Sequence, residues 1–96
     1  MRALIKNPGD EQFRQIVILN DLHLLQQLVG GYIETVTIST DACVICNEEG
    51  RIQGMPHNCS FCGIDFVGPI LIVGTDGDDF TDCPMSVNMA NGGIES

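Results

Sequence analysis

The chain has 96 residues, 44% of them hydrophobic, and its 13 acidic and 4 basic side chains give a net charge of −9. This length and composition allow one domain with a hydrophobic core, and no more than one. Four basic residues are too few for the positive surface that nucleic-acid binding needs, so we do not expect direct binding of DNA or RNA. An acidic surface suits solubility, or contact with a basic protein.

The N-terminal residues predict a β-hairpin. Ala3–Ile5 is a short apolar run that predicts a strand, and the turn-forming residues Asn7–Asp10 follow it. Proline presets its own backbone angle there, and glycine supplies a positive φ. The continuous β-branched run within Phe13–Leu19 predicts the second strand of the hairpin.

A short helix and a sharp change to strand follow. Apolar residues recur at helical spacing over Leu22–Val29, with Asn20 or Asp21 as the N-cap. The glycine pair Gly30-Gly31 predicts the end of the helix, with one glycine in the left-handed conformation. A helix this short is marginal alone, so it must pack on a sheet.

Three further strands are predicted after the helix. They cover the segments Tyr32–Ser39, Ala42–Cys46 and Phe66–Val73. Side chains alternate along a strand, so Tyr32 and Glu34 share one face of the first of them. Residues 51–58 support no firm assignment, and the small, Gly-rich residues 85–96 predict a frayed tail.

These elements predict an α+β fold, a single compact domain over residues 1–84 followed by a flexible C-terminal tail over residues 85–96. The domain has about five mostly antiparallel strands, with one short helix packed on one face of the sheet. Several strands carry apolar residues on both faces, and one helix covers only one of them. We therefore expect a homodimer or higher oligomer to cover the second face.

Neither a signal peptide nor a membrane-spanning run is predicted. Only three consecutive apolar residues precede Lys6, and the longest apolar stretch, Val67–Val73, is interrupted by Gly68 and Pro69. We expect a cytoplasmic protein without membrane contact. In that compartment the five cysteines are thiols or metal ligands rather than disulfides.

Four cysteines have the spacing of a zinc site, namely Cys43, Cys46, Cys59 and Cys62. The second pair, followed by Gly63, resembles a zinc knuckle. The first pair lies in a predicted strand, where residues three apart point to opposite faces and cannot reach one ion. We therefore expect the cysteines to be buried or surface thiols and no metal to be bound, with a zinc-stabilised structural domain as an alternative.

No catalytic set is recognisable. His23 and His57 have no spacing typical of a cysteine–histidine enzyme. The acidic turn Asp76–Asp79 lacks the length and the terminal glutamate of a calcium loop. The glycines build no phosphate-binding motif. We expect a protein that is not an enzyme and needs no cofactor.

Four motifs together suggest a family. They are Leu25–Glu34, Ile45–Gly50, Gly54–Asn58 and Gly68–Gly74, in this order. Over about residues 3–82 the chain resembles a small domain-of-unknown-function family of phages, conjugative elements and gut Firmicutes. Cys59 stands where this family would carry a basic residue. The resemblance implies a mobile genetic element in the cytoplasm of a bacterial host, and it implies no enzymatic activity.

The leading functional hypothesis is a non-enzymatic accessory protein that counters host defence by sequestering a small nucleotide-like signal in a pocket between subunits. Tyr32 would stack on a base, and Glu34 would accept a hydrogen bond from an amine or ribose hydroxyl. The turn amides of Asn47 and Asn58 would add further hydrogen bonds. The alternative is an acidic inhibitor that occludes a basic surface of a host defence protein.

Overall fold

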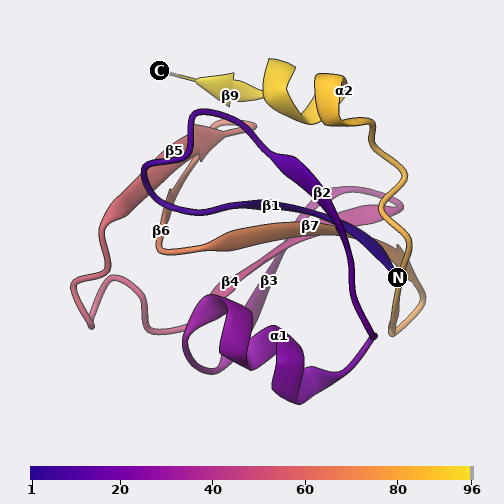
Figure 1. The fold of residues 1–96 in the computed structure, drawn as a ribbon, viewed down its shortest axis with the longest axis horizontal. Coiled ribbons are helices and arrows are strands. Elements are labelled where there is room, and N and C mark those ends of the chain that lie inside the picture. The colour runs from indigo at the N-terminus through magenta and orange to yellow at the C-terminus, as the bar shows by residue number, and fades with distance from the viewer. Residues whose placement is uncertain (96) are drawn as a thin grey trace.

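The computed structural model describes residues 1–95, which form two β-sheets and two helices (Figure 1). The elements in chain order are β1 (Arg2–Lys6), β2 (Arg14–Val17), α1 (Leu22–Val29), β3 (Ile33–Ser39), β4 (Ala42–Asn47), β5 (His57–Phe61), β6 (Ile64–Val67), β7 (Ile70–Asp76), β8 (Asp79–Thr81), α2 (Val87–Gly92) and β9 (Ile94–Glu95). None of the helices in these residues is long and apolar enough to cross a membrane.

The larger sheet has the strand order β2-β1-β7-β4-β3, with β8 paired to β7, and the smaller sheet has the order β6-β5-β9. Every pairing is antiparallel. The prediction of a compact α+β domain with mostly antiparallel strands and a short helix is confirmed. The larger sheet places β3 at one open edge and β2 at the other, and β6 is an open edge of the smaller sheet.

The two faces of the larger sheet are covered by different parts of the same chain. On β4, Cys43 and Ile45 belong to the core beneath α1, whereas Val44 and Cys46 belong to the core shared with the smaller sheet and α2. Figure 1 shows α1 on one side of the sheet and the β5–β6 hairpin, β9 and α2 on the other. The uncovered face from which we expected an oligomer is therefore covered by the chain itself.

Helix α1 begins and ends as predicted. The Asp21 carboxylate accepts a hydrogen bond from Leu24 N at 3.2 Å, and Gly30 closes the helix with φ 82°. The left-handed conformation is open to glycine because it has no Cβ. Leu25 and Val29 are the buried residues of the helix and pack on the larger sheet.

Two predicted segments differ from the structure, and one hairpin was not predicted. The strand expected over Phe66–Val73 is two strands in two sheets, because Gly68 adopts φ 71° between β6 and β7. Cys62 (φ 51°) and Gly63 (φ 78°) form a tight turn between β5 and β6, with the positive angles of a type I′ hairpin. Residues 85–95, expected as a flexible tail, hold α2 and β9, and Ser96 lies outside the described residues.

The C-terminal segment contributes to the core. Ala90 is fully buried, and β9 pairs with β5 through Ser60 and Phe61. Asn91 Oδ1 also accepts a hydrogen bond from Phe13 N at 2.7 Å. The sequence showed a run of small polar residues, and the contacts that order them come from residues far away in the chain.

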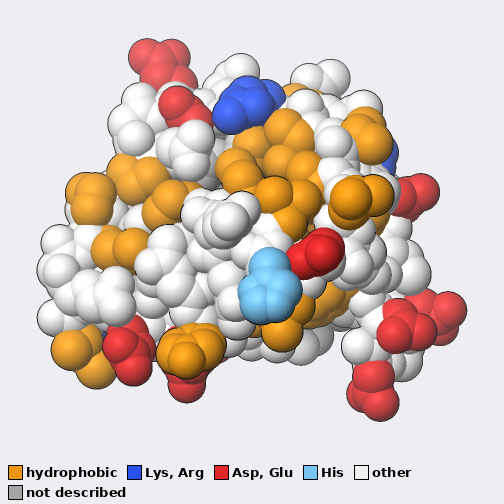
Figure 2. Space-filling model, turned by 60° about the horizontal axis from the view of Figure 1, so that its bottom comes forward, with side chains coloured by type: hydrophobic (Ala, Val, Ile, Leu, Met, Phe, Trp, Pro, Cys, Tyr) orange, Lys and Arg blue, Asp and Glu red, His pale blue; other side chains and the backbone are white. Residues whose placement is uncertain are grey.

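Figure 2 shows the side of the molecule toward which α1 lies, with hydrophobic side chains reaching the surface between scattered acidic ones. Three of the exposed large hydrophobic residues, Val17, Leu19 and Leu22, follow one another along the chain from the end of β2 to the start of α1. The homo-oligomer stays a prediction, and these residues are its best remaining support.

Candidate functional site

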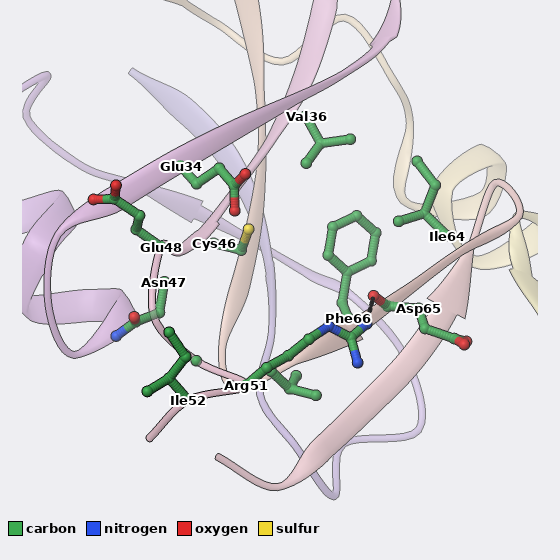
Figure 3. Close-up of a pocket in the computed structure, with 12 residues that line it drawn as sticks. Glu34, Val36, Cys46, Asn47, Glu48, Arg51, Ile52, Ile64, Asp65 and Phe66 are labelled. Carbon is green, nitrogen blue, oxygen red and sulfur yellow. Dashed lines mark hydrogen bonds between the residues drawn. The ribbon is translucent and has the colours of Figure 1, made fainter. Parts of the chain in front are cut away.

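A cleft of about 430 Å³ opens between the two sheets, where the edge strands β3 and β6 diverge. Its walls come from β3 and β4 on one side and from β6 on the other, and the loop between β4 and β5 closes one end (Figure 3). The loop approaches β6 closely because Gly50 has no side chain: a Cβ there would lie 2.9 Å from Val67 Cγ2.

The floor of the cleft is apolar and its rim is acidic. Val36, Cys46 and Phe66 line the floor, and all three belong to or pack against the core between the sheets. The rim carries three exposed carboxylates, those of Glu34, Glu48 and Asp65. Figure 3 shows the Glu34 carboxylate directed toward the Cys46 thiol.

Arg51 is the one cation that lines this cleft within residues 1–95. Its guanidinium donates a hydrogen bond to the backbone oxygen of Asp65 at 2.8 Å, the one hydrogen bond drawn among the residues of Figure 3. The Asp65 carboxylate itself accepts from the Ser60 hydroxyl. The three carboxylates thus outnumber the cation, and the cleft is suited to a positively charged or hydrogen-bond-donating group.

Burial, followed by the nearby Glu34 carboxylate, raises the pKa of the Cys46 thiol to about 11. Burial raises the pKa of the other four cysteines as well. A cysteine nucleophile needs the opposite shift, because the thiolate is the reactive form. At neutral pH the Cys46 thiol is therefore a neutral, weakly polar part of the floor.

This shift predicts alkaline destabilisation. The unfolded thiol ionises near its ordinary pKa of 9.0 while the folded one stays protonated, so the stability contributed by Cys46 is full below pH 9 and is lost as pH rises toward 11. Urea unfolding at several pH values between 8 and 11 should show that the free energy of unfolding falls more steeply with pH in the wild type than in Cys46→Ala. Equal slopes would contradict the buried, protonated thiol, since the two proteins differ only at this side chain.

Tyr32 and Glu34 lie in different recesses. Tyr32 is 70% exposed and precedes β3, where it lines a separate hollow of about 370 Å³ beside α1 together with Gln26 and Gln53. Glu34 lines the cleft between the sheets. Asn47 contributes to the lining of both. Tyr32 and Glu34, which were predicted to act together in one pocket, therefore line two different recesses.

The two predicted amides are engaged inside the protein. Asn47 Nδ2 donates to Val29 O at 3.1 Å, and its Oδ1 accepts from Glu49 N at 2.7 Å, so this side chain joins the end of α1 to the turn after β4. The Asn58 amide nitrogen donates to Lys6 O and Gly68 O, both at 2.8 Å. Asn58 Oδ1 accepts from Lys6 Nζ at 2.8 Å. Asn58 lines none of the recesses described here.

The sequence model of a family described as a domain of unknown function, DUF3846, matches residues 1–90. The chain belongs to this family. No curated protein and no solved structure matches the chain.

The four cysteines considered for zinc are spread over this DUF3846 domain. Cys43 faces α1 and Cys46 the opposite side of the same sheet, while Cys62 is exposed in the β5–β6 turn. Over residues 1–95 no group of three or more His, Cys, Asp or Glu side chains is placed to hold a metal ion. A shared zinc site would require β4 to break, as the strand periodicity indicated.

Sequence reasoning missed part of the cleft of the DUF3846 domain. Arg51 and Asp65 come from segments that gave no firm element, and Phe66 was assigned to a longer strand. One signal was available: Arg51 is the single basic residue after Arg14. Its proximity to Glu34 and Asp65 depends on the β5–β6 hairpin, which the local pattern did not reveal.

Proposed function

We propose that this protein is a non-enzymatic binding protein that occludes a basic surface of another protein through its acidic cleft. The observation that supports this best is the charge of the cleft: three rim carboxylates stand over an apolar floor, and the single guanidinium is bonded to a backbone oxygen. The resemblance to phage and conjugative-element proteins supplies the setting, a bacterial cytoplasm in which the partner would be a host defence protein.

The cleft fits a lysine or arginine side chain in both of its parts. The aliphatic stem of such a side chain packs on apolar surface while its charged head stays polar. Val36 and Phe66 offer the apolar surface, and the exposed Glu34 carboxylate on the same cleft can pair with the charged head. The net charge of −9 adds long-range attraction for a basic partner and speeds association.

A second candidate is the sequestration of a small nucleotide-like signal. The volume of about 430 Å³ and the aromatic floor residue Phe66 favour it, since a base needs an apolar, roomy recess. Glu34 would accept from an exocyclic amine, and Arg51 is the one cation of this cleft available for a phosphate. This cleft is formed within one chain, whereas the sequence led us to expect a pocket between subunits.

Calorimetry separates the two candidates. The titrants are a hexa-arginine peptide and, separately, ADP-ribose and cyclic dinucleotides. We expect the hexa-arginine peptide to bind, and we expect Glu34→Gln to lower its affinity about tenfold, which corresponds to about 1.4 kcal/mol. Glu11→Gln, an exposed carboxylate outside the cleft, is the matched control and should change affinity less than about twofold.

Two results would overturn the proposal. Equal losses in Glu34→Gln and Glu11→Gln would show that peptide binding follows net charge and not the cleft. Tight binding of a nucleotide, together with no binding of the peptide, would establish the second candidate instead.

A further inference from the structure

We infer that the outer edge of β3 is the docking edge for an extended segment of the basic partner, which adds to the larger sheet as a further strand. This inference rests on the proposed function and specifies how the partner binds. In this mode main-chain hydrogen bonds hold the added strand, and recesses on the two faces of the edge receive its alternate side chains.

The outer edge of β3 is unpaired within residues 1–95, because β3 ends the strand order of the larger sheet. Glu48 N donates to Tyr32 O at 2.9 Å just beyond the Ile33–Asn47 pair, which makes Ile33 and Asn47 a non-bonded pair of the β3–β4 ladder. Hydrogen-bonded and non-bonded pairs alternate in an antiparallel ladder. Counting along the register, Ile33, Thr35 and Thr37 point their N–H and C=O groups away from β4.

The edge lacks lysine and proline, two of the residues that most often block strand addition. Ile33–Ser39 contains no lysine and no proline, and its one register shift lies at the far end, between Thr37 and Ser39. The stretch from Ile33 to Thr37 pairs regularly with β4, so it can accept a regular strand on its other side.

Recesses lie on both faces of this edge. On one face, Glu34 and Val36 line the acidic cleft. On the other face, Thr35 and Thr37 line a hollow of about 400 Å³ that is distinct from the hollow beside Tyr32. Asp78 and Asp79 also line it. Successive side chains of an added strand point to opposite faces. Each would therefore enter one recess or the other, and both recesses carry carboxylates.

This arrangement specifies the partner as an extended segment with basic residues at alternate positions for the cleft, and small polar or basic residues between them for the hydroxyl-lined hollow. A helical basic segment would present its charges every three or four residues and would not match the spacing of the edge. The probe for testing is a ten-residue peptide of alternating arginine and threonine.

The first test changes the peptide and leaves the protein intact. Methylation of alternate backbone nitrogens removes main-chain donors and keeps every charge. Two such peptides exist, one methylated at the odd positions and one at the even positions. We expect one of the two to bind at least about tenfold more weakly than the parent peptide, since several ladder bonds are lost. Hydrogen exchange should slow at the outward amides of Thr35 and Thr37 when the parent peptide is bound.

The second test changes the protein. Thr35→Pro removes an outward N–H without taking a bond from the β3–β4 ladder, which is where edge strands tolerate proline. We expect about a tenfold loss of peptide affinity, whereas Thr35→Ser, which keeps both the N–H and the hydroxyl, should stay within about twofold. Circular dichroism confirms that both variants fold.

The outcomes separate this inference from the proposed function. If Glu34→Gln weakens the peptide but N-methylation and Thr35→Pro do not, the strand-addition mode is wrong and the acidic cleft remains the binding site. If the hexa-arginine peptide does not bind, or Glu34→Gln has no effect on its affinity, the proposed function itself fails and takes the inference with it. If hexa-arginine binds and the alternating peptide does not, only the strand-addition mode is wrong.

Discussion

Asn58→Ala is expected to lower the free energy of unfolding by about 4 kcal/mol. The side chain accepts from Lys6 Nζ and donates to Lys6 O and Gly68 O, all at 2.8 Å and all buried. Alanine takes the amide donor from Lys6 O and Gly68 O, and it leaves Lys6 Nζ with only its longer bond of 3.5 Å to the backbone oxygen of Asn58. Each buried polar group that loses its partner costs roughly 1–3 kcal/mol. Lys6 is only 3% exposed, so water cannot easily take the place of the amide.

Urea unfolding followed by circular dichroism measures this loss. Asn88→Ala, at an exposed position of α2, is the matched control and should change stability by less than about 0.5 kcal/mol. The double variant Lys6→Met, Asn58→Ala should be less unstable than the sum of its single changes, because the two side chains are direct partners. A loss below about 1 kcal/mol in Asn58→Ala would contradict the structural role of this amide and reopen its role as a ligand contact.

Gly74→Ala is expected to cost about 3 kcal/mol or more, and to disturb the pairing of β7 with β8. A Cβ on Gly74 would lie only 2.2 Å from the backbone oxygen of Asp82 and 2.6 Å from Thr81 Oγ1. A backbone atom cannot rotate away as a side-chain end can, so β8 has to move from its place beside β7. Overpacking of this kind typically costs about 1–3 kcal/mol and sometimes more.

The matched control is Gly92→Ala in α2, where an added Cβ meets nothing within 4 Å. Alanine is the better helix former, so this change should be neutral or should stabilise the protein by up to about 1 kcal/mol. Thermal unfolding of the two variants beside the wild type gives the comparison. Similar melting temperatures for all three would show that β8 does not lie against β7 at Gly74.

Much of the fold could be predicted where one segment of sequence contains its own signal. Helix α1 carries its apolar spacing, its Asp21 cap and its Gly30 stop within about ten residues, and the structure shows all three. The alternation on β3 and β4 was likewise local, and it correctly separated Cys43 from Cys46 onto opposite faces. The sequence also made clear that apolar residues on both faces of the sheet needed cover.

The division of Phe66–Val73 and the order in residues 85–95 could not be predicted, because their causes lie far away in the chain. Gly68 turns the backbone so that Phe66 and Ile70 belong to different sheets. The β5–β6 hairpin, α2 and β9 then cover the face for which we expected another subunit. Local propensity is weak in such segments, so pairing partners distant in sequence decide their structure.

For the candidate site, the sequence determined the chemistry and the tertiary structure decided the grouping. A strongly acidic chain with four cations was evident from composition, and it suited either a solvated surface or contact with a basic protein. Only the packing of two sheets brought Glu34, Arg51 and Asp65 to one cleft, moved Tyr32 to another hollow, and placed Asn47 and Asn58 in internal hydrogen bonds. Side-chain charge is a property of each residue by itself, whereas a cleft exists only between segments that the fold brings together.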